Sequence, residues 1–539
     1  MSAATGGGER YTVLVTDGIS ESGLEPLRAD DRFEIVKIDD SKDPAFAAAL
    51  PGAHGLVVRS ATKVRAELLE QATSLRVVGR AGVGVDNIDL AEATARGIAV
   101  MNAPAGNTVS AAELTLALVL AMVRRVPEAD ASVRSGEWAR SRFQGAELRG
   151  RMLGLIGAGR IGGEVAARCR AFGMSVVAYD PYLTAERAAE LRLEQAGSLE
   201  DVLDRADVLS LHVPLTDATR DMIDADALAR MKPGSFLVNV ARGGVVDEDA
   251  LADALESGHL AGAALDVFAS EPLAAESRLR GVPNLVLTPH LGASTAEAQE
   301  LVATEICEAV RNALADGDLS RSLNAPAIGG DTMRRLGPLF ELGEALGRLV
   351  CALAPGAVRE MEVRYAGDAD DALEPLAAFV LVGFLTDVLG AEQVNFVSAG
   401  HLARQRDIGV ARTRLSSHAD YGEYVEVVVD AERGDLRVAG ALLGDVHPRI
   451  VRIGDYHVDV APQGTLIVLK NDDVPGVIGR VGTLLGSHGI NIAGYHQSRL
   501  SRGGKALAAV VVDEVVDPGV RDALLELPEV SSAVVVGLG

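Results

Sequence analysis

The sequence has few aromatic residues and only one tryptophan. Aromatic residues make up 4% of the 539 positions, whereas hydrophobic residues in total make up 48%. The cores must therefore be built mainly from Ala, Val and Leu. A chain of this length is expected to fold into three or four domains.

Basic residues are too few to balance the acidic ones. The chain has 51 Lys and Arg against 76 Asp and Glu, which gives a formal net charge of −25. Nucleic acid and anionic membrane surfaces need a basic footprint, so both are excluded as main partners. An anionic small molecule can still bind where a few arginines form a local positive pocket.

Cysteines and long apolar runs are also scarce. Cys169, Cys307 and Cys351 are far apart, with no CxxC pair and no His/Cys spacing suited to zinc. We expect reduced thiols, no metal site and a cytoplasmic location. The start MSAATGGGER lacks the features of a secretory signal. The apolar stretch Pro375–Leu385 is shorter than the ~20 residues of a membrane span.

Short Val-rich runs alternate with helical stretches from Tyr11 onwards, which predicts parallel strands with crossover helices. A long helical pattern covers about Thr108 to Arg125, and the rhythm restarts at MLGLIGAG. The chain thus holds two α/β units in tandem. A helix at about Thr295 to Ala315 ends the second unit, and turn-forming residues at 316–318 and 324–326 mark a linker.

The C-terminal part follows a different order. Residues 331–354 have the apolar spacing of a helix, and several strands follow, with a hairpin turn at Gly454-Asp455. This third region is expected to be α+β. The last 75 residues predict the order βαββαβ of a ferredoxin-like domain.

A dinucleotide-binding motif lies in LGLIGAGRIGGEVA. Gly157, Gly159 and Gly162 form GxGxxG between a strand and a helix, where they permit a tight turn, a close approach of pyrophosphate and helix–strand packing. Asp180 ends the next strand, where a carboxylate can accept bonds from the adenosine ribose. A carboxylate there repels a 2′-phosphate, so NAD is favoured over NADP.

Three charged residues follow predicted strands of the second unit: Arg242 in NVARGG, Glu271 in ALDVFASEP and His290 in LTPHLGAST. Ligands bind at the carboxyl ends of strands in open α/β sheets. Imidazole suits transfer of an alcohol proton, a carboxylate can orient it, and a guanidinium can hold a substrate carboxylate. We therefore predict that His290 is the acid/base, Glu271 its partner and Arg242 the anchor.

These segments resemble the signature motifs of the D-isomer-specific 2-hydroxyacid dehydrogenases over residues 11 to about 325. The resemblance implies two Rossmann-like domains, with the NAD domain inserted into the substrate domain. It also implies further cofactor contacts in the glycine turn, after three strands and around the nicotinamide. Beyond the residues already named, these are Arg160, Ile161, Val213, Val240, Ala241, Asp266, Leu291, Gly292 and Ala293.

Within that family, GLVVRSATKV and VVGRAGVGVDNID resemble the phosphoglycerate dehydrogenases. The resemblance implies that D-3-phosphoglycerate is the substrate. It places Arg59, Ser60 and Arg80 against it, with Asn102 and Asn107 on the same wall. The intervening and ACT domains of the long form of this enzyme match the third and fourth regions.

The predicted fold class is therefore α/β in two doubly wound domains, followed by an α+β intervening domain and a ferredoxin-like ACT domain. The predicted bounds are 10–107 and 296–325 for the substrate domain, 108–295 for the NAD domain, 326–461 for the intervening domain and 464–539 for the ACT domain.

The first half of the ACT-like domain also resembles the segment that binds serine in phosphoglycerate dehydrogenases. Asp473 and Asn491 match positions that, in the resembling enzymes, bind an effector between two subunits, whereas Asn471 in the same loop sits where other members vary. L-serine is therefore an expected effector, and a homo-oligomer, dimer or tetramer, is expected. In some relatives the intervening domain binds an anion through a His and an Arg four residues later. Here His457 matches, but the Arg position is Ala461.

Two other functions remain open from the sequence. The chain can be another D-2-hydroxyacid dehydrogenase, such as a hydroxypyruvate or glyoxylate reductase. It can also be an NADH-sensing binding protein without turnover, although the intact trio of Arg242, Glu271 and His290 counts against that. The C-terminal domain can likewise serve only as a dimerisation sheet.

Overall fold

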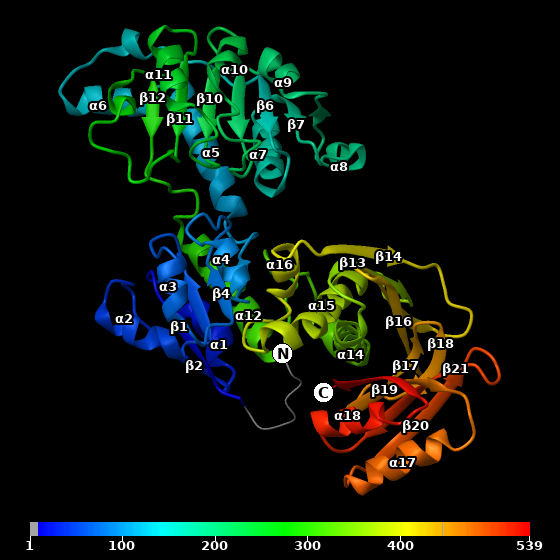
Figure 1. The fold of residues 1–539 in the computed structure, drawn as a ribbon. Helices are drawn as coiled ribbons and strands as arrows, with labels where there is room; N and C mark the ends of the chain where they lie inside the picture. The colour runs from blue at the N-terminus through cyan, green and yellow to red at the C-terminus, as the bar shows by residue number, and fades with distance from the viewer. Residues whose placement is uncertain (1–8, 445, 539) are drawn as a thin grey trace.

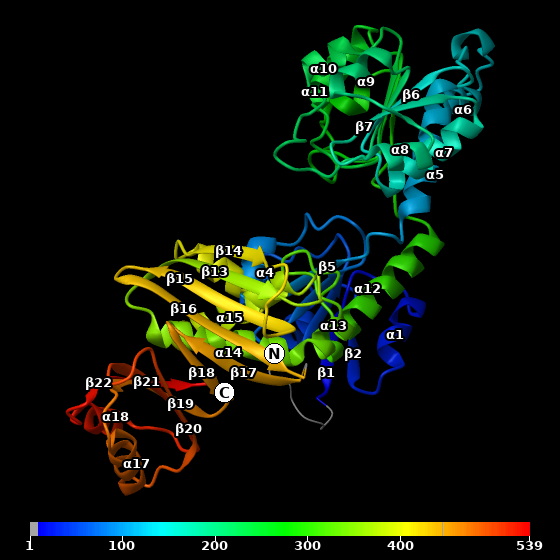
Figure 2. The ribbon, with the colours of Figure 1, turned by 90° about the vertical axis from the view of Figure 1, so that its right-hand side faces the viewer.

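The computed structural model describes residues 9–444 and 446–538, which contain four β-sheets in chain order. In Figure 1 the second unit stands apart from the other three, and Figure 2 shows α5 and α12 running between it and the first unit. The third region and the C-terminal domain lie beside and beyond the first unit. The predicted fold class is confirmed.

The first sheet is parallel, in the order β2-β1-β3-β4-β5. Its strands are β1 (Tyr11–Val15), β2 (Phe33–Lys37), β3 (Gly55–Val58), β4 (Val77–Arg80) and β5 (Ala99–Asn102). Its short helices are α1 (Glu25–Arg28), α2 (Pro44–Ala49), α3 (Ala66–Gln71) and α4 (Leu90–Ala95). Phe46 of α2, Leu69 of α3 and Ala93 of α4 are buried against one face of the sheet.

The long helix α12 (Ala296–Asp316) covers the other face of the first sheet. Val302, Ile306 and Val310 are buried there with residues of β1, β3 and β4. Thr295 begins α12 by accepting the amide of Ala298, as an N-cap residue should. The chain after residue 295 therefore packs on the first sheet, as the family resemblance implies.

The second sheet is also parallel, in the order β12-β11-β10-β9-β6-β7-β8. Its strands are β6 (Met152–Ile156), β7 (Ser175–Tyr179), β8 (Glu194–Gln195), β9 (Val208–Leu211), β10 (Phe236–Asn239), β11 (Gly262–Leu265) and β12 (Leu285–Leu287). Its helices are α5 (Thr108–Val123), α6 (Val126–Arg134), α7 (Arg160–Ala171), α8 (Ala185–Glu190), α9 (Leu199–Arg205), α10 (Ala225–Arg230) and α11 (Glu248–Glu256). Both faces are covered, so the strands are nearly continuous in apolar residues.

The third region has a mixed sheet, in the order β14-β13-β15-β16-β17-β18. Its strands are β13 (Val358–Ala366), β14 (Gly409–Arg414), β15 (Glu423–Ala431), β16 (Gly434–Leu443), β17 (His447–Ile453) and β18 (Tyr456–Val460). The helices α14 (Gly337–Leu353) and α15 (Leu373–Leu389) pack together and against the sheet, and α16 (Ala399–Arg404) contacts α4 of the first unit.

Residues 331–354 are helical as predicted, but they form two helices. The structure has a short α13 (Gly330–Arg335) and a separate α14, with Pro338 in the first turn of the second helix. Proline has no N–H to donate and its ring clashes with the preceding turn, so the helix must restart there. The segment around Asn324 is also no loose linker, because its amide group bonds Val100, Thr94 and Ile98 of the first unit.

The C-terminal domain has the predicted βαββαβ order. Its antiparallel sheet runs β20-β21-β19-β22, with α17 (Val477–Ser487) and α18 (Pro518–Leu525) on one face. The strands are β19 (Thr465–Asp472), β20 (Ile492–Arg499), β21 (Lys505–Val512) and β22 (Val530–Gly537). The opposite face packs on the third region.

All three cysteines are free thiols. Cys169 and Cys307 are buried and Cys351 is half-buried, and burial raises the pKa of the Cys169 thiol to about 11. Among the described residues, no helix combines the length and the apolar character that a membrane span requires.

Candidate active site

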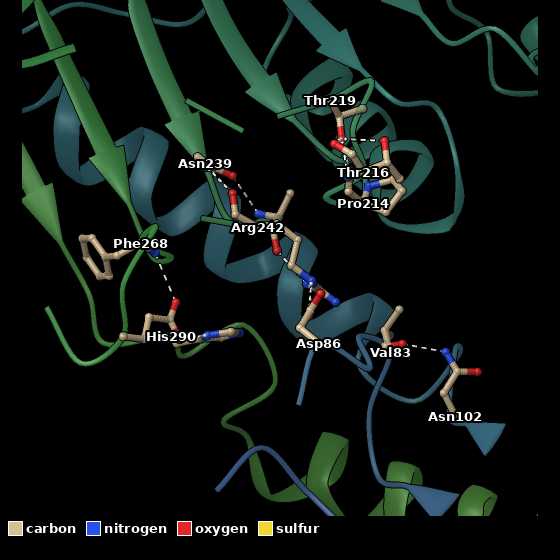
Figure 3. A network of polar contacts seen from close by, with 12 residues as sticks. Val83, Asp86, Asn102, Pro214, Thr216, Thr219, Asn239, Arg242, Phe268 and His290 are labelled. Carbon is tan, nitrogen blue, oxygen red and sulfur yellow. Dashed lines mark hydrogen bonds and ion pairs between the residues drawn. The ribbon is translucent and has the colours of Figure 1, made fainter. Parts of the chain in front are cut away.

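The three predicted catalytic side chains meet at one edge of the second sheet. β10, β11 and β12 are neighbours, and Arg242, Glu271 and His290 come from the loops that follow their carboxyl ends. Figure 3 shows Arg242 and His290 beneath the strands, facing the loops of the first unit. The site therefore lies between the two units, where an open α/β sheet binds its ligands.

Glu271 and His290 form a hydrogen-bonded pair. His290 Nδ1 lies 2.8 Å from Glu271 Oε2, and the amide of Phe268 donates to Glu271 Oε1 over 3.1 Å. Burial raises the pKa of Glu271, but the hydrogen bond and charge of His290 and the Phe268 amide outweigh it, so the net pKa is lowered. An ionised carboxylate only accepts, so Nδ1 carries the proton and Nε2 is left as the free basic nitrogen.

Asp266 lies beneath the loop that carries His290. Its side chain is fully buried and accepts the amides of Leu291 and Gly292 at 2.8 and 2.9 Å, together with the Thr288 hydroxyl. Burial raises its pKa, with these hydrogen bonds opposing. His290 itself has a positive φ of 54°, an uncommon backbone state that the surrounding bonds must hold. Asp266 thus fixes the backbone that carries the imidazole.

Arg242 reaches from the second unit to the first. Its Nε lies 3.2 Å from Asp86 Oδ2, and its Nη1 donates to the carbonyl of Ala241. Asn239, buried at the end of β10, shapes the turn by donating to the Arg242 carbonyl and accepting the Ala241 amide. Figure 3 shows Arg242 and Asp86 facing each other across the gap.

The glycine turn has the shape that a dinucleotide requires. Gly157 has a positive φ of 92°, and a Cβ there would lie 2.5 Å from the carbonyl oxygen of His212. A Cβ at Gly162 would collide with the Gly157 carbonyl, whereas one at Gly159 would have no described heavy atom within 4 Å. The first and third glycines are thus required by packing, and the second leaves open space at the start of α7, where Arg160 and Ile161 form the first turn.

Asp180 both faces this turn and holds it. Its Oδ2 accepts the amide of Ala158 and its Oδ1 that of Tyr182, each over 2.9 Å. The remaining lone pairs can accept ribose hydroxyls. Below the turn, His212 bonds the Ser210 hydroxyl over 2.8 Å, and burial lowers its pKa to about 4. The residues present therefore fit a bound NAD.

The other expected cofactor residues follow the same sheet edge. Val213 comes after β9 and contacts the Gly157 turn, and Val240 and Ala241 come after β10. Gly292 lies near both Asp266 and Val240. Leu291 is 38% exposed beside it, and Ala293 continues the loop.

The first unit contributes the opposite wall. Arg80 ends β4 and is largely enclosed, and its Nε has no hydrogen-bond partner among the described residues. Burial, together with the charges of Arg242 and Arg59, lowers its pKa to about 10, and the charge of Asp86 opposes this shift. The three guanidinium groups are thus close enough to repel one another. They give this part of a strongly acidic protein a local positive charge.

The remaining predicted wall residues are placed less uniformly. Ser60 is exposed in the loop after β3, and Asn107 precedes α5 with its Oδ1 buried and unpaired among the described residues. Asn102 donates to the Val83 carbonyl over 2.6 Å, so it shapes the loop that holds Asp86 (Figure 3).

Sequence reasoning missed several residues that organise this wall. Asp17 accepts the amides of Arg59 and Thr62, and Asn87 donates to the carbonyls of the same two residues. Asp86 pairs with Arg242. Asp17 could have been identified, because it lies two residues after the end of β1 in VTDG. Asp86 lies in a loop that no strand-end rule identifies.

The predicted effector residues are not brought together within one chain. Asp473 accepts Arg499 Nη1 and the Gly503 amide, and Asn491 donates to Asp513. The pairing of β21 puts Asp472 beside Lys505, its first residue, and Ile492 beside Val512, its last. Asn471 is buried close to Asp473, and its Oδ1 has no partner within the described part of the chain. In the third region, His457 is the cross-strand neighbour of Arg452, and Ala461 follows β18.

Comparison with known proteins shows that the chain is similar to D-isomer specific 2-hydroxyacid dehydrogenases. Residues 116–292 match the NAD-binding domain of D-isomer specific 2-hydroxyacid dehydrogenases, 335–454 the D-3-phosphoglycerate dehydrogenase intervening domain, and 465–529 the ACT domain. A crystal structure of D-lactate dehydrogenase from Aquifex aeolicus, complexed with NAD and lactic acid, is similar at TM-score 0.51 and 32% identity. It covers 58% of this chain and 100% of its own. The TT0316 protein from Thermus thermophilus is similar at TM-score 0.53 and 38% identity, over 58% of this chain and 99% of its own.

Two relatives cover nearly the whole chain. The D-3-phosphoglycerate dehydrogenase of Bacillus subtilis is 39% identical over 98% of this chain and 100% of its own length. That of Mycobacterium leprae is 42% identical over 98% and 99%. The chain therefore belongs to the D-3-phosphoglycerate dehydrogenase family.

Proposed function

We propose that the protein oxidises D-3-phosphoglycerate to 3-phosphohydroxypyruvate with NAD, the first step of the phosphorylated route to L-serine. The observation that carries this is the meeting of Arg242, Glu271 and His290 at one sheet edge, opposite Arg59 and Arg80. The substrate has a carboxylate and a phosphate, and a pocket of three guanidinium groups matches both. The similarity to D-3-phosphoglycerate dehydrogenases over nearly the whole chain supports the same substrate.

The chemistry follows from the geometry of the pair. NAD, when held by the glycine turn and Asp180, would supply the acceptor for the hydride that leaves C2 of the substrate. His290 Nε2 takes the C2 hydroxyl proton, while Nδ1–H stays bonded to Glu271, which stabilises the imidazolium that forms. Arg242 holds the substrate carboxylate and polarises the developing carbonyl oxygen. Gly157, Gly159, Gly162 and Asp180 hold the dinucleotide.

The test is NADH formation followed by absorbance. Purified protein with NAD is assayed with D-3-phosphoglycerate and, at equal concentration, with D-glycerate. We expect kcat/KM to favour the phosphorylated acid strongly. Equal rates, or turnover only in reduction of glyoxylate or hydroxypyruvate, would identify another dehydrogenase of the family. NADH binding without turnover on any of these acids would identify a sensing protein.

We further propose that L-serine binds the ACT domain and slows this reaction, in a cytoplasmic homo-oligomer. The ACT-domain match supports a small-molecule effector, and Asp473 and Asn491 supply the groups that a zwitterion needs. Serine titration of activity and of binding, on the intact protein, tests this directly.

A further inference from the structure

Asp86 is a carboxylate close to Arg242 and Arg80, on the wall proposed to bind an anionic substrate. It lies in the loop between β4 and α4, in the first unit, and faces Arg242 of the second unit (Figure 3). Its Oδ2 is 3.2 Å from Arg242 Nε, and its side chain is 65% exposed. A carboxylate on such a wall competes with an anionic substrate, so its presence needs a reason.

The backbone around Asp86 is fixed from three sides. The Asp86 carbonyl accepts Arg65 Nη2 over 2.9 Å, the Val83 carbonyl accepts Asn102, and Asn87 donates to two carbonyls of the neighbouring loop. The carboxylate is therefore held in place before any ligand arrives. Ordinary exposed ion pairs lack such support and contribute little.

The guanidinium of Arg242 packs closely against the backbone of this loop. A Cβ on Gly84 would collide with Arg242 Nη2, so the guanidinium lies directly against the loop backbone. Asp86 meets Nε, and the Ala241 carbonyl meets Nη1. Within residues 9–444 and 446–538, Nη2 has no recorded hydrogen bond, which leaves one edge of the guanidinium for a substrate oxygen.

Asp86 also offsets the mutual repulsion of the arginines. Arg80 is lowered in pKa by burial and by Arg242, and Asp86 opposes this shift. One carboxylate thus stands between guanidinium groups of both units. Without it, Arg242 would turn away from Arg80 and lose its fixed direction.

We propose that Asp86 is a positioning residue that holds Arg242 in the orientation needed to bind and polarise the substrate. It acts through Arg242 and makes no contact with the reacting atoms. This inference rests on the proposed dehydrogenase function and adds a specific role to the first unit: it orients a side chain of the second.

The experiment compares Asp86→Asn and Asp86→Glu with the wild type in steady-state kinetics. Asp204→Asn is the matched control, because Asp204 pairs with Arg230 over 2.7 Å on the second unit's own surface. We expect kcat for Asp86→Asn to fall about 10²-fold, as misplacement of a positioned group does. Asp86→Glu should recover part of the loss, the control should be unchanged, and NADH binding measured by fluorescence should be unchanged in all variants. A kcat for Asp86→Asn within about twofold of the wild type overturns the proposal.

A double-mutant cycle tests the route of action. In an Arg242→Lys background, Asp86→Asn should cost at most about threefold, because the group that it orients is already altered. An equal loss in both backgrounds overturns the proposal. Each variant is assayed with D-3-phosphoglycerate and with D-glycerate. If the wild type prefers the second acid, the substrate proposal fails while the role of Asp86 is still decided on the acid that turns over.

Discussion

Replacing Asp180 by Asn should change the cofactor preference without breaking the glycine turn. Asp180 directly follows β7 and accepts the Ala158 amide in that turn. The Asn side chain keeps one oxygen acceptor for this bond but loses the charge. Asp180→Ala removes both, so the two variants separate the role in the turn from the role towards the ribose.

The size of the effect can be worked out from two contributions. A hydrogen bond to a charged group contributes about 1.5–3 kcal/mol, so its weakening should raise the KM for NAD about tenfold. The repulsion between a carboxylate and a 2′-phosphate about 5 Å away is about 1.5 kcal/mol in a water-like dielectric, so its removal should favour NADP about tenfold. Together they shift the preference for NAD over NADP by about 100-fold.

The assay is the ratio of kcat/KM for the two cofactors, with D-3-phosphoglycerate saturating. Asp180→Asn should shift the ratio, and Asp180→Ala should in addition weaken both cofactors because the Ala158 amide loses its acceptor. Asp204→Asn again serves as a control for loss of a surface carboxylate. A shift of less than about fivefold for Asp180→Asn would refute the assignment of Asp180 to the ribose.

Three further predictions concern other sites. His290→Ala should lower kcat about 10²–10⁴-fold and leave NADH binding by fluorescence unchanged; a wild-type kcat would contradict it. The pKa of His212 is lowered to about 4, so it stays neutral in the fold while its unfolded form binds a proton below about pH 6.5. The free energy of unfolding should therefore decrease as the pH falls below that value. In urea unfolding, the decrease between pH 7.5 and pH 5 should be about 2 kcal/mol smaller in His212→Gln than in the wild type. An equal decrease in both proteins would contradict this. L-serine should bind saturably and lower activity with a coupling of about 1–3 kcal/mol; binding that survives both Asp473→Ala and Asn491→Ala would remove the site.

The three residues that we propose to be catalytic could be located from the sequence because their signals are local. Each side chain follows a Val- or Ala-rich strand, and parallel strands that are neighbours in a sheet end at one edge. The glycine turn is equally local, since its spacing and the following helix are adjacent in the chain. Asp86 shows the limit: its role depends on Arg242, which lies far away in the sequence, and nothing in GVGVDN marks the contact.

The third region shows the same limit for the fold. In β13, Met361, Val363 and Tyr365 alternate as buried residues, so the sequence does carry a period-two signal for this strand. β14 at the sheet edge has no buried residue and gives no such signal. The break before α14 was readable from Pro338. The features that could not be predicted from the sequence are therefore edge strands such as β14 and the pairing of strands that are distant in the chain.

The proposed effector site requires residues from two chains. Asp473 lies at the Lys505 end of β21 and Asn491 at the Val512 end, about 24 Å apart at ~3.4 Å per residue. One chain therefore cannot close a pocket the size of an amino acid around both residues. β20 is one of the two edge strands of the sheet, and an antiparallel pairing of two β20 strands about a two-fold axis would bring Asn491 of one chain to the Asp473 end of the other. Two equal sites would result, and serine binding should weaken on dilution to concentrations where the chains separate.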